Sequence, residues 1–172
     1  EPVEQLLFFA AQKLKTTAVP NKLKGKYHKT VEQILSSNLL GKHLASKEEM
    51  LEELYPLDPL AADILTKSLQ RYGQNERSLF TFLESPEIIE AQVTERFFTV
   101  ANCFDYLLKN LNSEIEDGEK NPFKPQWKAA IVALEKAEFI FDENYIEASN
   151  IIKTICLVNI FSNASGKLDD NV

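Results

Sequence analysis

The spacing of apolar residues is the feature that most constrains the fold of this chain. Near the start of the chain, apolar residues fall three or four positions apart at Val3, Leu6, Leu7, Ala10, Ala11 and Leu14. This spacing predicts an amphipathic helix over residues 3–16. No segment alternates apolar and polar residues long enough to predict a strand, and no repeat of fixed period is present. We therefore expect an all-α fold, an irregular array of about seven or eight helices.

Capping and breaking residues divide the rest of the chain into further helices. Pro20, Gly25 and the neighbouring lysines interrupt the first pattern, so the next helix is expected over residues 28–38. Ser46 and Glu49 have the spacing of a capping box and predict the start of a short helix.

Asp58 precedes Pro59, and this pair predicts a capped helix start. Gly73 is expected to end that helix at its C′ position. A further helix is predicted from about residue 75, with four buried apolar residues: Leu79, Phe80, Phe82 and Leu83. Two more are predicted over residues 86–96 and from Val100 to near Asp117. The next begins at Pro122 and Pro125, and its apolar side holds Trp127, Ile131, Val132 and Leu134.

The last predicted helix, from Glu143 to Phe161, is the most hydrophobic. Its apolar residues cover most of its circumference: Ile151, Ile152, Ile155, Cys156, Leu157, Val158 and Ile160. A helix that is apolar nearly all round is expected to be buried by its neighbours.

The length of 172 residues suits one helical region, either single or made of two packed subdomains over 1–85 and 86–172. The chain begins with Glu1 rather than methionine and ends in a polar run, so we expect a fragment of a larger protein. No apolar stretch is long enough to span a membrane, and the start lacks the pattern of a signal peptide. The two cysteines, Cys103 and Cys156, lie among apolar residues and are expected to be buried thiols of a cytoplasmic protein.

Several kinds of catalytic site are missing from the sequence. There is no phosphate-binding loop, dinucleotide fingerprint or nucleophile elbow. His28 and His43 have no histidine or cysteine at metal-ligand spacing and are expected on the surface. The many carboxylates are interpreted as solvated helix faces. We therefore expect no enzyme activity, no catalytic residues and no metal site in this chain.

The formal net charge of −7 argues against a general nucleic-acid surface. One stretch departs from this average, because it holds six lysines and no acidic residue: Lys13, Lys15, Lys22, Lys24, Lys26 and Lys29. A solvated segment is the simpler interpretation, and contact with nucleic acid is a third hypothesis for the function.

The segment Arg71 to Leu83 concentrates polar and charged residues, Gln74 to Arg77, at a turn between two helices. In the simplest interpretation, Asn75 caps the second helix, Glu76 complements its dipole and the phenylalanines fill the core. In the functional interpretation, Arg77 reaches a phosphate on a neighbouring domain, since guanidinium carries a permanent charge and a planar fork of donors.

Two segments resemble a pattern in large bacterial ATP-binding proteins. These are P-loop ATPases of the broad AAA+/STAND type, some of them in phage-defence systems such as BREX. The pattern, close to Tyr-Pro-Leu-His-Pro and then Phe-Gly-Gln-Asn-Glu-Arg-Thr-Leu-Phe-Ser-Phe-Leu, is similar to residues 55–59 and 72–83. A later element, typically Leu-Lys-Thr-Ile-Ala-Leu-Leu-Asn-Leu, is similar to Ile151–Phe161. Asp58 stands where the family usually has histidine.

The resemblance implies a non-catalytic helical lid or linker that couples nucleotide state to other domains. ATP and magnesium would bind the ATPase core of the parent protein. The cofactor-binding residues of this chain would be Arg77, which contacts the nucleotide or the ATPase core, and Asn75 and Glu76, which shape the turn. The ATPase core and further domains would then be its partners, with no membrane contact. The alternative is a helical protein–protein interaction module without nucleotide contact.

Overall fold

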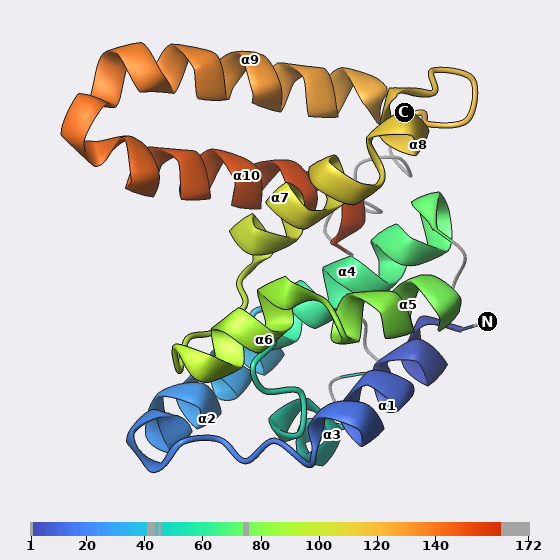
Figure 1. Ribbon diagram of the computed structural model, residues 1–172, viewed down its shortest axis with the longest axis vertical. Coiled ribbons are helices and arrows are strands. Elements are labelled where there is room, and N and C mark those ends of the chain that lie inside the picture. The colour runs from blue at the N-terminus through green and yellow to red at the C-terminus, as the bar shows by residue number, and fades with distance from the viewer. Residues whose placement is uncertain (1, 41–43, 45, 74–75, 163–172) are drawn as a thin grey trace. The chain divides into compact units, whose positions relative to one another are not determined.

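A computed structural model describes residues 2–40, 44, 46–73 and 76–162 of the chain (Figure 1). These residues form ten α-helices, α1–α10, and one short 3-10 helix, η1, with no strand among them. The all-α fold class is confirmed. The predicted number of helices was too low, partly because the stretch from Val100 to Asp117, expected as one helix, forms two.

The contacts within the chain divide it into two compact units, Glu1–Thr99 (unit 1) and Val100–Val172 (unit 2). The division follows Thr99 rather than residue 85, because the segment after residue 85 bonds to the start of the chain. Gln92 donates a hydrogen bond to Thr17 at 3.3 Å, and Glu95 forms an ion pair with Lys22.

Unit 1 is built around one helix that is buried along most of its length, α4 (Pro59–Tyr72). Helices α1, α2 and α5 pack against it. The other helices of this unit are α1 (Val3–Leu14), α2 (Asn21–Ser36), α3 (Glu48–Glu52), α5 (Glu76–Leu83) and α6 (Pro86–Val93).

Helix α2 begins earlier than the sequence suggested, at Asn21 instead of residue 28. Pro20 occupies the N-cap position and so marks a helix start instead of a break. Tyr27 and Val31, four residues apart, are fully buried on one face, and Gly25 lies in the exposed part of the helix. The burial of this face outweighs the modest helix-breaking tendency of one glycine.

The segment between α3 and α4 is held by backbone hydrogen bonds to a distant part of unit 1. The amide of Asp58 donates to the carbonyl of Phe98 at 2.9 Å, and the amide of Phe98 donates to the carbonyl of Pro56 at 2.8 Å. Tyr27 adds a hydroxyl bond of 2.7 Å to the carbonyl of Leu57. These bonds fix the point from which α4 starts.

Asp58 caps α4 as predicted. Its Oδ1 accepts hydrogen bonds from the amides of Leu60 at 2.9 Å and Ala61 at 3.3 Å, and Pro59 follows at the first helical position. Burial raises the pKa of the Asp58 carboxyl, and the two amide bonds oppose that rise only in part. Helix α3 begins at Glu48, with Lys47 at the N-cap position that was expected for Ser46.

Unit 2 contains α7 (Val100–Asn110), α8 (Asn112–Glu116), α9 (Lys124–Phe141), η1 (Asp142–Asn144) and α10 (Tyr145–Phe161). Helices α9 and α10 run antiparallel as a hairpin, and α7 packs against α10 (Figure 1). The ring of Trp127 lies 5.0 Å from that of Phe104, centroid to centroid. Lys153 of α10 forms an ion pair of 2.8 Å with Asp105 of α7.

The predicted apolar faces of the hairpin were partly wrong. In α9 the buried residues are Trp127, Ala130 and Ala137, and Val132 is 44% exposed. In α10 only one side is covered, since Ile151 is 60% exposed. The small alanines allow close approach of the packed helices, which leaves larger side chains outside the contact. In unit 1, Phe80 was expected in the core and is 40% exposed.

Candidate functional site

The predicted site lies at the start of α5. Arg77 and Glu76 form the first residues of this helix, and Asn75 lies outside the described residues. Arg77 is exposed, and its guanidinium bonds to none of the residues that the structure describes. Its backbone carbonyl accepts a hydrogen bond of 2.9 Å from the hydroxyl of Thr81. The side chain therefore stands on the surface, available to a group outside this chain.

The far side of α5 is anchored in the core of unit 1. Leu79, Phe82 and Leu83 are buried, and the ring of Phe82 meets that of Phe98 edge-on at 5.2 Å. Because the buried face cannot rotate without exposing these side chains, α5 presents Arg77 from a defined position.

Gly73 follows the end of α4, just before this site. Glycine is needed at this position for a reason that differs from the expected one. Its φ is −108°, so it does not adopt the left-handed conformation of a C′ glycine. Instead, a Cβ at this position would lie 2.7 Å from Oγ of Ser78 and 2.9 Å from the carbonyl oxygen of Leu69. Gly73 is required by the close approach of the first turns of α5 to the end of α4.

The six lysines do not form one free basic surface. Three of them contact partners within unit 1: Lys13 with Glu84 at 3.1 Å, Lys22 with Glu95, and Lys26 above the ring of Phe97 at 5.5 Å. The other three, Lys15, Lys24 and Lys29, are exposed. The two ion pairs offset part of the positive charge, and contact with nucleic acid stays a prediction.

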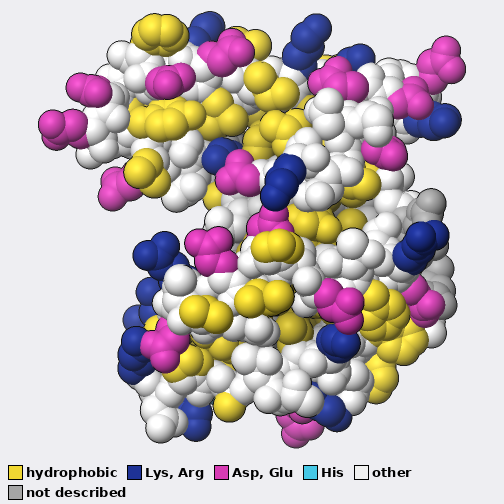
Figure 2. Space-filling view, in the orientation of Figure 1, with side chains coloured by type: hydrophobic (Ala, Val, Ile, Leu, Met, Phe, Trp, Pro, Cys, Tyr) yellow, Lys and Arg dark blue, Asp and Glu magenta, His cyan; other side chains and the backbone are white. Residues whose placement is uncertain are grey.

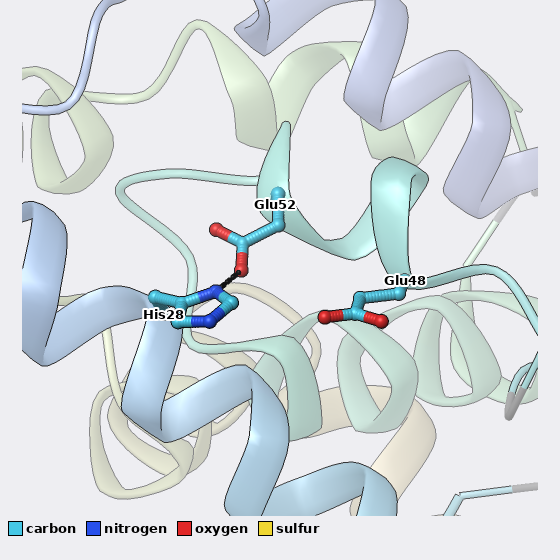
Figure 3. A group of neighbouring side chains, drawn as sticks. All are labelled: His28, Glu48 and Glu52. Carbon is cyan, nitrogen blue, oxygen red and sulfur yellow. Dashed lines mark hydrogen bonds and ion pairs between the residues drawn. The ribbon is translucent and has the colours of Figure 1, made fainter.

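A cluster that the sequence did not predict joins α2 to α3 (Figure 3). Nδ1 of His28 lies 2.6 Å from a carboxylate oxygen of Glu52, the contact drawn as a dashed line in Figure 3. Nε2 of His28 lies 3.6 Å from a carboxylate oxygen of Glu32. Glu48 is the third member of a group whose potential ligand atoms all lie within 4.8 Å of one another. The signal in the sequence was the four-residue spacing of Glu48 and Glu52, which places both on one face of a helix.

One nitrogen and several carboxylate oxygens could serve as zinc ligands. The hydrogen bond that Nδ1 of His28 donates to the Glu52 carboxylate, followed by the charges of Glu52 and Glu32, raises the pKa of His28 and favours the protonated ring. The ion pairs already account for the geometry, so we interpret the group as a pH-sensitive link between two helices. His43 lies outside the described residues.

The two cysteines are free and buried, as the sequence predicted. Burial raises the pKa of the Cys156 thiol to about 11, and its sulfur lies 3.8 Å from the carbonyl oxygen of Gln126. A thiol in this environment is a poor nucleophile at neutral pH, because very little of it is ionised.

Comparisons with protein-family models, with curated proteins and with solved structures find no match for this chain. Among the described residues, the helices are too short or too polar for any of them to cross a membrane.

Proposed function

We propose that this chain is a non-catalytic helical region of a larger P-loop ATPase of the AAA+/STAND type, in which it couples nucleotide state to other domains. The observation that carries the proposal is the exposed guanidinium of Arg77, which bonds to no described residue and stands on a helix anchored in the core. The resemblance of residues 72–83 to a motif of such ATPases supports the same assignment.

A fixed arginine of this kind suits recognition of phosphate. Guanidinium keeps its charge at all physiological pH values and can donate two parallel hydrogen bonds to one phosphate group. The ATPase core would hold ATP and magnesium, and Arg77 would contact the nucleotide or the core beside it. Loss of the terminal phosphate would remove that contact, and unit 1 would then change its position relative to the core.

The proposal includes a cytoplasmic location and a role in a phage-defence system. The free thiols of Cys103 and Cys156 agree with a reducing compartment. The phage-defence role rests on the resemblance alone.

Arginine substitutions in the full-length ATPase test this function. Arg77→Ala is expected to lower ATP hydrolysis or nucleotide affinity at least tenfold, as loss of an arginine contact to a phosphate does. Arg77→Lys should restore only part of the activity, because lysine keeps the charge and loses the fork. Arg96→Ala is the matched control, since Arg96 is also an exposed arginine of unit 1 and lies outside the motif.

An ATPase that is indifferent to Arg77→Ala would refute the nucleotide contact. The chain would then be better described by the alternative, a helical interaction module. In that case the charged turn before α5 is only a helix start, and the resemblance explains the fold alone.

A further inference from the structure

Helix α10 carries apolar residues on two opposite sides, and only one of them is covered. Cys156, Leu157 and Ile160 are buried on the side that faces the rest of unit 2. On the opposite side, Ile151 is 60% exposed and Ile155, one turn later, is 54% exposed. A helix that is apolar nearly all round is normally buried on all sides. This pattern therefore indicates a second contact surface on α10.

The exposed side of α10 is hollowed and extends to the tip of the hairpin. A hollow of about 500 Å³ is lined by Phe141, Asn144, Glu147, Ala148, Ile151 and Ile152. Further large apolar side chains are exposed around the tip: Phe139 at 89%, Ile140 at 71% and Ile146 at 71%. Monomeric soluble proteins rarely expose large apolar side chains in groups, and such groups mark interaction sites.

The same tip is strongly acidic. Residues 135–147 contain five acidic side chains and one lysine, and all five acids are exposed: Glu135, Glu138, Asp142, Glu143 and Glu147. None of the five forms an ion pair with a residue that the structure describes. Figure 2 shows apolar side chains along the hairpin and acidic ones at its end.

This charge distinguishes among the partners that an apolar surface can take. A second copy of the chain would bring two acidic tips together, and like charges at an interface are costly. An anionic membrane would repel the tip in the same way. A helix with apolar residues on one face and lysine or arginine beside them complements both the hollow and the charge.

We infer that the outer side of α10 and the hairpin tip form a docking surface for a basic amphipathic helix of a partner protein. Apolar side chains of that helix fill the hollow beside Ile151, and its basic residues pair with Glu143 and Glu147. The inference goes beyond the proposed nucleotide coupling. It does not depend on Arg77, and its test uses this chain without nucleotide.

Two synthetic helical peptides test the surface. Both have leucine on one face, and the other face is lysine in one peptide and glutamate in its counterpart. Fluorescence anisotropy with the full 172-residue chain should show saturable one-to-one binding of the lysine peptide. The glutamate peptide should bind at least tenfold more weakly, and the affinity for the lysine peptide should fall as salt is added.

Variants then assign the binding to the hairpin. The double substitution Ile151→Ser and Ile155→Ser should weaken binding of the lysine peptide at least tenfold. Val93→Ser is the control, because Val93 is an exposed apolar residue of unit 1, at 77%. Glu143→Gln with Glu147→Gln should remove part of the salt dependence, and this variant leaves every buried side chain intact.

Equal binding of the two peptides would overturn the inference, as would full binding by the double serine variant or no binding at low salt. Sedimentation that shows a dimer lost on Ile151→Ser would identify a second copy as the partner instead. Binding to lipid vesicles that is lost in the same variant would identify a membrane. Either result would refute the basic helix as the occupant.

Discussion

Replacing Gly73 by alanine tests the close packing between the end of α4 and the first turns of α5. The added Cβ would lie 2.7 Å from Oγ of Ser78 and 2.9 Å from the carbonyl oxygen of Leu69. Both distances are shorter than 3.0 Å, and Cβ atoms in real proteins essentially never approach other atoms this closely. The Leu69 carbonyl lies in the last turn of α4 and accepts the hydrogen bond of the Gly73 amide, so it cannot move aside as the Ser78 side chain can. The backbone at the end of α4 must therefore shift.

The expected cost follows from two opposing effects. Overpacking of this kind costs about 1–3 kcal/mol. Alanine also lowers the conformational entropy of the unfolded chain relative to glycine, and this effect stabilises the folded state by about 0.4–1 kcal/mol. The net loss in the free energy of unfolding should be about 1–2 kcal/mol. With a urea dependence of about 1–3 kcal/mol per molar, the unfolding midpoint should move down by roughly 0.3–2 M.

Circular dichroism at the helix band during urea titration is the suitable assay. Fluorescence of Trp127, the only tryptophan, would report on unit 2 instead of unit 1. Gly25→Ala is the matched control: Gly25 lies inside α2, and a Cβ there would have no atom within 4 Å. Because alanine favours helix over glycine, this variant should gain about 0.5–1 kcal/mol. A stability of Gly73→Ala equal to or above that of the unsubstituted chain would refute the packing argument.

Three further predictions concern single residues. Asp58→Ala should lower the free energy of unfolding by about 1–2 kcal/mol in the same urea titration, because two amides at the start of α4 lose their acceptor, and Asp58→Asn should recover most of it. His28 should titrate in NMR above its ordinary pKa of 6.5, and Glu52→Gln should lower that pKa while Glu49→Gln leaves it unchanged. Its link to α3 should stabilise the fold fully below pH 6.5 and be lost as the pH rises through the folded pKa, so Glu52→Gln should flatten this part of the stability profile. Alkylation of Cys156 should follow a pH profile with a midpoint of about 11, and a midpoint of about 9 would contradict the burial of this thiol.

Local features of the sequence predicted the local structure well. The spacing of Leu6, Leu7, Ala10 and Leu14 predicted α1, and these side chains are buried. The Asp58–Pro59 pair predicted the capped start of α4. Both predictions succeeded because helix periodicity and capping depend on residues within a few positions of each other, which the sequence displays directly.

The structure gives the position of Arg77 in the fold and leaves its predicted role as a site residue untested. Placing Arg77 at a helix start needed only the local pattern, and the structure agrees. Its lack of a bonded partner among the described residues could not be read from the sequence, because a sequence does not show which acidic residues fold near a given arginine. The contact with nucleotide stays a prediction.

Contacts between segments distant in the chain were decided only by the tertiary structure. Packing of α2 against α3 places His28 beside Glu48 and Glu52. The structure also shows that glycine is needed at position 73 because a Cβ would clash there, and not because the backbone adopts a left-handed turn. The apolar pattern of α10 predicted burial over most of its circumference, and it did not show that the described residues cover only one side. The physical reason is that the burial of a helix face depends on which other segment of the protein packs against it. The apolar pattern of the helix indicates only that such a face favours contact with another apolar surface.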